Sequence, residues 1–510
     1  MNQKPNIVIV MTDQHRADVC AREGFPLDTT PFLDSLARNG VWFNRAYTAA
    51  PICVAARVSM LTGRYPNATR VRSNHNTQDA TYEKDIFDVM KEQSYATAMV
   101  GKNHSHLTPD RVDHWFSLGH GGGSGEDRTE QEKAFDQYLR NLKHRADMNP
   151  APFPLECQGP YRAVSDAQKW IGTLEGKPFF LWLTFAEPHN PYQVPEPYFS
   201  MFPPESLPPV HAGVESLANK GFKWEWTYQL GKLAFPDYDE QVPRARANYF
   251  GMLRLIDDQI KRFVGFLDSE GLRENTILIF TSDHGDFVGE YGLVRKGPEM
   301  PELLMRIPFL FNGPGIKSDS NPHPAYVSIV DIMPTLCEAI GVSTPVGVQG
   351  KSLWPLLDGT ESRPLLTHNY PDEEFASVYA EQGFGGLHYT EDDDLSPVEE
   401  GCLNDNVSFD CLNSWTQSGT MRMLRKGDWK LVFDMQGRGQ LYNLSLDRFE
   451  LKNLYDNPEY AGVQREMLAE AFAWSLRAQD PLPLPRRRYV MKTDPRNYWS
   501  PYRCARSKGE

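Results

Sequence analysis

Four short apolar runs, rich in β-branched and aromatic residues, most constrain how this chain can fold. They cover residues 6–11, 96–100, 179–185 and 276–281. Their length and continuous hydrophobicity are typical of parallel strands that are buried on both faces. Helical periodicity lies between them and is clearest over residues 245–267. This alternation predicts an α/β fold in which helices sandwich a large, mostly parallel sheet.

Polar side chains follow each of these four predicted strands. Because parallel strands end at the same edge of a sheet, and ligands bind at that edge, we expect one site built from distant parts of the chain. Taken singly, such residues have ordinary explanations, since a lysine is usually a solvated surface charge and an aspartate often caps a helix. The residues concerned are Asp13, Gln14, Lys102, His189, Asp283 and His284.

The last third of the chain has a different pattern. Short strands are predicted on both sides of a turn at residues 426–428 and again over residues 440–443, with a helix over residues 462–477. We therefore predict an N-terminal catalytic domain of residues 1–364. A smaller α+β subdomain of residues 365–510 would follow, with a four-stranded antiparallel sheet and a terminal helix.

Composition excludes some classes of partner. The formal net charge of -14 argues against a nucleic-acid partner, which requires a basic surface. No apolar run is long enough to cross a membrane. The first strand follows the amino terminus directly. We expect a periplasmic or secreted protein whose signal sequence was removed, with a cytoplasmic protein as the alternative. Seven cysteines do not form a disulfide scaffold, and the pairing of Cys402 with Cys411 stays open.

Cys53 lies at the start of a predicted helix, four residues before Arg57. A thiol at a helix amino terminus beside a cation is activated. Four arginines and no acidic residue occur from Cys53 to Arg72, which indicates an anion pocket within an acidic protein. A buried cysteine on a basic helix is the alternative interpretation.

The stretch around Cys53 resembles the modification signature of the type I, formylglycine-dependent sulfatase family, in the alkaline phosphatase-like superfamily. That signature reads Cys-x-Pro/Ala-x-Arg followed by Leu-Thr-Gly, and this chain has Ala55 where proline is commoner. Several further segments resemble family motifs in the same order along the chain. They are residues 5–14, 101–104, 188–192, 249–260, 282–286, 296–297, 429–432, 441–443 and 450–454.

The resemblance implies a sulfuric ester hydrolase in which Cys53 is converted to formylglycine (3-oxoalanine). A formylglycine-generating enzyme or an anaerobic sulfatase-maturating enzyme would act as the partner in that conversion. In the family the aldehyde hydrates to a diol, one hydroxyl attacks sulfur, and the second later expels sulfate. A metal activates the diol, and the resemblance implies Ca²⁺, with Mg²⁺ as the alternative. The implied metal ligands are Asp13, Gln14, residue 53, Asp283 and His284.

The same resemblance assigns the remaining catalytic roles. Arg57, Lys102 and Lys296 would balance the charge of the sulfuryl oxygens. His104 would orient or deprotonate the diol, and His189 would protonate the leaving alcohol. Asp286 is interpreted as structural.

Two other functions stay open. Gln14 departs from the commoner Asp-Asp pair and also occurs in related phosphonate monoester and phosphodiester hydrolases, which are the first alternative. The Lys102-x-His104 pair favours the sulfatase interpretation. The second alternative is an inactive carbohydrate-binding homologue that keeps an unmodified Cys53.

The substrate is expected to be a sulfated saccharide, such as a glycosaminoglycan fragment, because the surroundings of Cys53 are rich in arginine. A glycine-rich loop at residues 121–125 is expected at the rim of the pocket. Three aromatic residues, Trp224, Trp226 and Tyr228, could stack on a sugar ring or simply pack. The candidate substrate-binding residues are Arg72, Asn74, His75 and His106.

Overall fold

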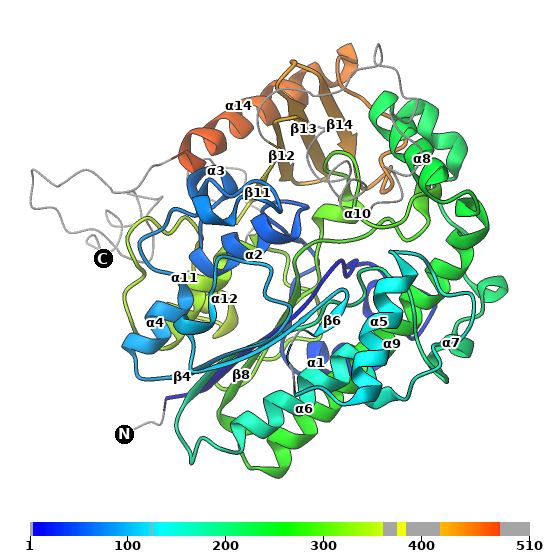
Figure 1. Cartoon of the computed structure of the whole chain (residues 1–510). Coiled ribbons are helices and arrows are strands. Elements are labelled where there is room, and N and C mark those ends of the chain that lie inside the picture. Colours follow the sequence, from blue (N-terminus) through cyan, green and yellow to red (C-terminus); the bar gives the residue numbers. More distant parts are fainter. Residues whose placement is uncertain (1–3, 124, 126, 361–374, 384–418, 480–510) are drawn as a thin grey trace, which may run out of the picture.

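An eight-stranded sheet forms the centre of the protein, in the order β2-β9-β8-β1-β7-β4-β5-β6. The computed structural model describes residues 4–123, 125, 127–360, 375–383 and 419–479 (Figure 1). The central strands β8, β1, β7, β4 and β5 pair in parallel, whereas β9, β2 and β6 make antiparallel pairs at the two edges. The strands are β1 (Asn6–Thr12), β2 (Val41–Trp42), β4 (Ala96–Gly101), β5 (His114–Gly119), β6 (Gly122–Gly123), β7 (Phe179–Thr184), β8 (Thr276–Ser282) and β9 (Phe309–Asn312).

The four strands predicted from the sequence are adjacent in space, as β8-β1-β7-β4. All seven residues of β1 are buried, because helices cover both faces of the sheet. Side chains alternate along the strand, so Ile9 faces one core and Val8 the other. Ile9 pairs with Trp182 of β7 and with Ile279 of β8. The predicted sandwiched, mostly parallel sheet is thus confirmed.

Each face of the sheet is covered by its own set of helices. Helices α1 (Pro31–Arg38), α6 (Gly159–Ile171) and α9 (Tyr238–Ser269) bury residues on the Val8 face. Helices α2 (Cys53–Thr62), α4 (Ile86–Glu92) and α11 (Ile332–Ala339) cover the Ile9 face. Figure 1 shows α6 and α9 on one side of the sheet and α4 and α11 on the other.

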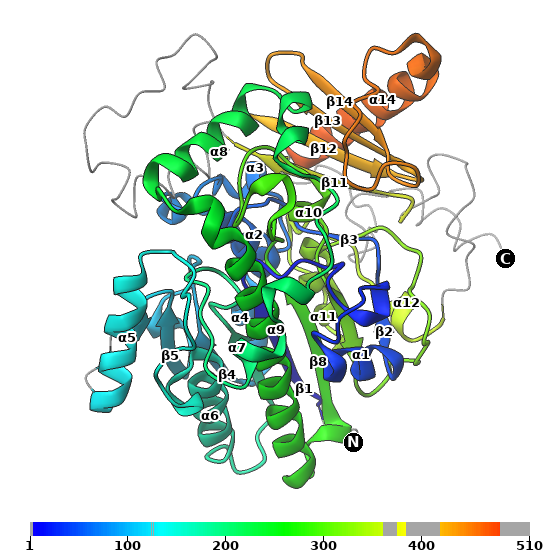
Figure 2. The ribbon, with the colours of Figure 1, turned by 90° about the vertical axis from the view of Figure 1, so that its right-hand side faces the viewer.

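The C-terminal part has its own antiparallel sheet, in the order β11-β12-β13-β14. Its strands are β11 (Ser377–Gln382), β12 (Met421–Lys426), β13 (Trp429–Asp434) and β14 (Gly439–Asn443). Helix α14 (Ala461–Ala478) packs against this sheet (Figure 2). Trp474 of the helix stacks on Tyr379 of β11 at 5.9 Å between ring centroids. The predicted four-stranded sheet and terminal helix are confirmed. The predicted division at 364/365 and the pair Cys402 and Cys411 lie outside the described residues.

Within the described residues no helix is long and apolar enough to cross a membrane.

Other helices and strands connect these parts. The remaining helices and strands are β3 (Ala46–Tyr47), α3 (Pro66–Thr69), α5 (Glu130–Leu142), α7 (Tyr198–Met201), α8 (Phe222–Ala234), α10 (Glu302–Met305), β10 (Val327–Ser328) and α12 (Trp354–Leu357).

Candidate active site

The carboxyl ends of β1 and β8 bring four candidate ligands together beside the first turn of α2. Potential ligand atoms of Asp13, Cys53, Asp283 and His284 all lie within 4.8 Å of one another. All four residues are buried. The site predicted from separate strand ends therefore forms one cluster, as expected for the edge of a parallel sheet.

Cys53 is the first residue of α2, where the helix dipole favours a negative group. Its Sγ atom lies 3.2 Å from His284 Nε2 and 3.7 Å from Asp13 Oδ1. The side chain of Asn74 accepts a hydrogen bond of 3.2 Å from the amide of Val54 in the same turn. Residue 53 is thus fixed against the carboxylate and imidazole groups.

The tautomer of His284 follows from its contacts. Its Nδ1 lies 2.9 Å from the carbonyl oxygen of Gly285, to which only a protonated nitrogen can donate. Burial lowers the pKa of His284 to about 4, so the imidazole is neutral at neutral pH. Nε2 therefore carries a lone pair that faces Cys53, as a metal-ligating histidine requires.

Arg57 balances the buried carboxylates. Its Nε donates to Asp283 Oδ2 at 2.8 Å, and its Nη2 lies 3.5 Å from Asp13 Oδ2. Its Nη1 donates to the carbonyl oxygen of Lys102 at 2.6 Å and to Thr184 Oγ1 at 2.9 Å. Burial opposes the ionisation of Asp283, but His284, Arg57 and Lys102 outweigh it and lower the pKa of this carboxyl.

Gln14 is held in one orientation by Asp286. The Gln14 backbone has φ of 63°, which turns its amide towards Asp283 Oδ1 at 3.1 Å. The side-chain Nε2 donates to Asp286 Oδ2 at 2.9 Å, so the amide oxygen is on the opposite side, 3.4 Å from Lys296 Nζ. Asp286 thus directs the amide oxygen of Gln14 into the site. The residue that was interpreted as structural, Asp286, therefore orients a candidate metal ligand.

The donor set fits a divalent cation. It combines two carboxylates, one amide oxygen and one neutral imidazole, and its negative charge is already opposed by Arg57 and Lys102. Oxygen-rich ligation of this kind suits calcium or magnesium, while the imidazole nitrogen is also compatible with softer divalent ions. The cluster could therefore hold a metal beside residue 53.

Two lysines and two histidines lie beside this cluster of candidate metal ligands. Lys102 Nζ contacts Asp13 Oδ2 and lies 2.6 Å from His120 Nε2. Lys296 Nζ lies 3.4 Å from His189 Nε2, while His189 Nδ1 lies 2.6 Å from the carbonyl oxygen of Asn190. Lys296 and His189 are therefore neighbours, and Lys102 lies against His120 and Asp13. The catalytic roles of Lys102, His189 and Lys296 stay predictions.

The histidines of the site are neutral at neutral pH. Burial, together with the charge of Lys102 and Lys296, lowers the pKa values of His104, His120 and His189 well below the usual range. His104 has φ of 43°, and its Nδ1 is buried without a hydrogen-bond partner among the described residues. An anion entering the site would favour protonation of these rings.

His120 was missed by the sequence analysis. It directly follows β5, and its ring stacks on that of His189 with 3.6 Å between centroids. The available signal was a polar residue after a strand, as for Lys102. The strand itself is hard to recognise, because His114–Gly119 is only partly buried and contains no β-branched residue.

The candidate substrate-binding residues differ in their surroundings, and their role stays a prediction. Asn74 lies next to the Cys53 helix, and Arg72 Nη1 lies 3.5 Å from Asn67 Oδ1. His75 is exposed. His106 Nε2 lies 2.8 Å from Asp85 Oδ2, and Asp85 caps α4, so this ring is tied to a structural carboxylate.

The aromatic side chains of α8 are packed. Trp224 is 1% exposed and donates from Nε1 to Glu299 Oε2 at 2.9 Å. Trp226 and Tyr228 are also buried, in a cluster with Phe287 and Tyr291. The packing interpretation of these residues therefore fits the structure better than stacking on a sugar.

Comparison with known proteins agrees with the resemblance of the sequence motifs to the sulfatase family. The family model described as Sulfatase matches residues 5–342. The chain is 28% identical to an arylsulfatase of Clostridium perfringens, over 90% of this chain and 91% of that protein. It is also 28% identical to an ulvan-active sulfatase of Formosa agariphila, over 74% of this chain and 72% of that protein. The fold is similar to that of the phosphonate monoester hydrolase of Agrobacterium radiobacter, with a TM-score of 0.72 and 20% identity over 93% of this chain and 96% of that one.

The matched region contains every residue of the cluster, from Asp13 to Lys296. Family and homologues together support sulfuric ester hydrolase activity. The chain belongs to the sulfatase family.

Proposed function

We propose that this enzyme hydrolyses a sulfate ester of a saccharide, with a nucleophile derived from Cys53 and a divalent metal, Ca²⁺ in preference to Mg²⁺. The observation that carries the proposal is the position of Cys53 Sγ. It lies among Asp13, Asp283 and His284 at the amino terminus of α2, and Arg57 and Lys102 pair with these carboxylates. A formylglycine at residue 53 would supply a hydrated aldehyde hydroxyl there as the nucleophile.

Asp13, Gln14, Asp283 and His284 would hold the metal, which would supply Lewis acidity that favours ionisation of the nucleophile. Arg57 bridges the two carboxylates and balances their charge, because it contacts both. Lys102 and Lys296 place two ammonium groups where negative charge develops on the sulfuryl oxygens.

Two histidines are suited to proton transfer. His104 is half-buried, with its Nδ1 buried, and feels the charge of Lys102; we assign it to orienting or deprotonating the nucleophile. His189 is assigned to the leaving group. Its Nδ1 is occupied by the Asn190 carbonyl, which leaves Nε2 to exchange a proton with the ester oxygen.

A saccharide is the proposed substrate class, because the homologue from Formosa agariphila is described as acting on ulvan and because four arginines occur from Cys53 to Arg72. A glycosaminoglycan fragment is one such substrate. We further propose maturation by a formylglycine-generating or anaerobic sulfatase-maturating enzyme, and a periplasmic or secreted location.

The test is a screen of defined sulfated saccharides with sulfate release as the readout, run on protein whose residue 53 has been examined by peptide mass spectrometry. We expect turnover that is lost on chelation and restored by calcium. Cys53→Ala should retain substrate binding and lose turnover. A pure thiol at Cys53 in protein from its native host would instead support an inactive carbohydrate-binding homologue.

A phosphonate monoester or phosphodiester hydrolase is the second candidate, and Gln14 favours it. An amide in place of a carboxylate removes one negative charge from the metal cluster. Comparing kcat/KM for an aryl sulfate and the matching aryl phosphonate ester separates the two. Faster cleavage of the phosphonate would reject the sulfatase proposal.

A further inference from the structure

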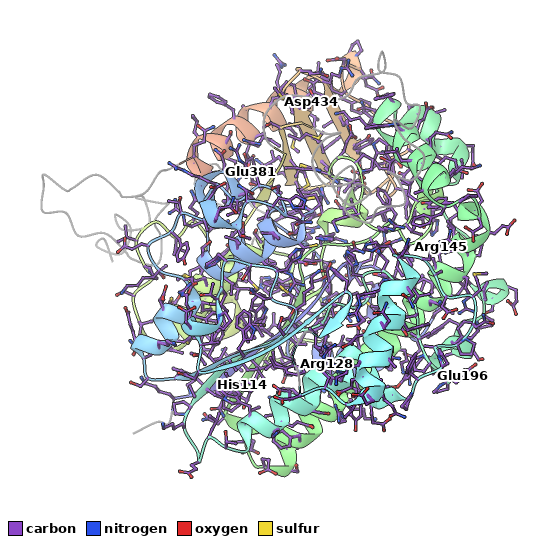
Figure 3. All side chains as sticks on the ribbon, in the orientation of Figure 1. His114, Arg128, Arg145, Glu196, Glu381 and Asp434 are labelled. Carbon is purple, nitrogen blue, oxygen red and sulfur yellow. The ribbon has the colours of Figure 1, made fainter. Side chains whose placement is uncertain are left out.

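The turn that carries His120 is held against α5 by contacts with Asp136 of that helix. Gly122 has φ of +82°, and a Cβ atom added there would lie 1.8 Å from Asp136 Oδ1, so the backbone approaches this carboxylate closely. The amide of Gly123 donates to Asp136 Oδ2 at 3.1 Å. Asp136 is buried and is itself held by Arg128 and Arg162, each at 2.7 Å (Arg128 is labelled in Figure 3). The position of His120 is therefore fixed by a buried ion-pair network rather than by a free loop.

Two contacts define how the His120 ring lies in the site. Its Nε2 is 2.6 Å from Lys102 Nζ, and because an ammonium group can only donate, this nitrogen accepts. The proton of the neutral ring is then on Nδ1, a buried atom without a hydrogen-bond partner among the described residues. The flat face of the ring covers His189, at 3.6 Å between centroids and 25° between planes.

His189 is consequently restrained on three sides. Its Nδ1 is occupied by the carbonyl oxygen of Asn190, its Nε2 faces Lys296 Nζ, and its face lies against His120. A hydrogen bond at one ring atom alone would still allow the imidazole to tilt. A stacked neighbour removes that freedom, and small errors in the alignment of a catalytic group are costly.

We propose that His120 is a positioning residue for leaving-group protonation, which it serves by stacking on His189 while its Nε2 holds Lys102. This inference rests on the proposed function. As the sulfuryl group passes to the nucleophile, the bond between sulfur and the bridging ester oxygen breaks and its electron pair stays on that oxygen. Binding of the anionic ester favours protonation of the neutral His189 ring, which takes up a proton from water at Nε2. The imidazolium then transfers this proton to the same oxygen and is neutral again.

The proposal predicts a specific dependence on the leaving group. A nitrophenolate leaves readily without protonation, whereas a phenolate or alkoxide of low acidity needs the proton. His120→Ala should therefore lower kcat/KM about tenfold or more for unsubstituted phenyl sulfate but only a few-fold for 4-nitrophenyl sulfate. This outcome corresponds to a steeper slope of log kcat/KM against leaving-group pKa.

Three variants separate stacking from other effects. His120→Phe keeps an aromatic face against His189 but loses the acceptor for Lys102, so it should retain the wild-type slope. His114→Ala is the matched control, because His114 (labelled in Figure 3) is the first residue of β5, whereas His120 follows the last. The His114 ring stacks on Trp170 at 5.8 Å between centroids. It should leave the slope unchanged. His120→Asn provides the same test as alanine if the alanine variant does not fold.

The two proposals fail in different ways. All variants are compared after normalisation to the fraction of residue 53 that is converted. If the wild-type protein cleaves no sulfate ester, the proposed function is overturned and this inference with it. If the wild type is active and His120→Ala lowers kcat/KM by the same factor for phenyl sulfate and for 4-nitrophenyl sulfate, only the positioning role is overturned. Additive effects of His120→Ala and His189→Ala on phenyl sulfate cleavage would also overturn it, since residues that act together are non-additive.

Discussion

Replacing Asp286 by asparagine should weaken metal binding without removing any metal ligand. Asp286 accepts four hydrogen bonds. Its Oδ1 accepts from the amides of Val288 and Arg295 at 2.7 and 2.9 Å, and its Oδ2 accepts from Tyr192 and Gln14, both at 2.9 Å. An asparagine can keep its oxygen towards the two amides, but it then turns an N–H₂ group towards Gln14 Nε2. Two donors face each other, and the Gln14 amide must flip and direct its own N–H₂ group at the metal.

The size of the effect follows from that contact. A hydrogen bond to a charged group contributes about 1.5–3 kcal/mol, and loss of a partner that orients a metal ligand typically costs about 10–100-fold in affinity. Since about 1.4 kcal/mol corresponds to a factor of ten, the two figures agree. We therefore expect the calcium affinity of Asp286→Asn to fall about 10–100-fold.

Isothermal titration of the calcium-free enzyme measures this directly. Asp257→Asn is the matched control, since Asp257 of helix α9 is also a buried acceptor of two backbone amides, those of Phe32 and Leu33 at 2.8 Å each. It should alter stability but leave calcium affinity unchanged. The double variant Gln14→Glu with Asp286→Asn restores one donor and one acceptor to the contact, so it should recover binding. An affinity of Asp286→Asn within about twofold of wild type would refute the reasoning.

Three further predictions concern stability. Arg57→Ala leaves the buried carboxylates of Asp283 and Asp13 without the cation that they share. In calcium-free buffer the free energy of unfolding measured in urea should therefore fall by about 3–5 kcal/mol, and a fall of less than about 1 kcal/mol would contradict this. Trp224→Ala empties a core position and should cost about 3–5 kcal/mol in the same assay with KM for saccharide unchanged, whereas a raised KM would indicate a sugar-stacking role. Burial opposes the ionisation of Asp18, but Arg16 outweighs it and lowers the pKa of this carboxyl. The stability difference between wild type and Asp18→Asn should therefore be constant above about pH 5 and shrink as the pH falls below about 4, which acid titrations of unfolding can check.

The centre of the fold was predictable because its signals are local. Strands β1, β4, β7 and β8 are continuous apolar runs, and both their existence and the polar residues after them can be identified without knowledge of the partners. The strands on either side of this centre were not predicted. β2 and β6 have two residues each, and β5 is partly exposed, so pairing with neighbours rather than composition makes them strands.

Some residues of the candidate site could likewise be predicted from the sequence, and others could not. Asp13, Lys102, His189 and Asp283 lie at recognisable strand ends, and the structure brings them together. His120 follows a strand that has no clear signal, so its stacking on His189 depends on tertiary structure alone. The orientation of Gln14 by Asp286 could not be predicted either, because it depends on a contact between residues 272 positions apart in the sequence.

The position of β1 between β7 and β8 has a consequence for synthesis of the chain. The first strand made must wait for residues 179–184 and 276–282 before its edges are paired. Likewise, 231 residues separate Cys53 from His284, which helps to bury it. At a translation rate of about 5–20 residues per second, that interval corresponds to about 10–50 seconds. Until then the residues that enclose Cys53 in the folded protein have not all been made, and the apolar residues of β1 lack both of their strand partners.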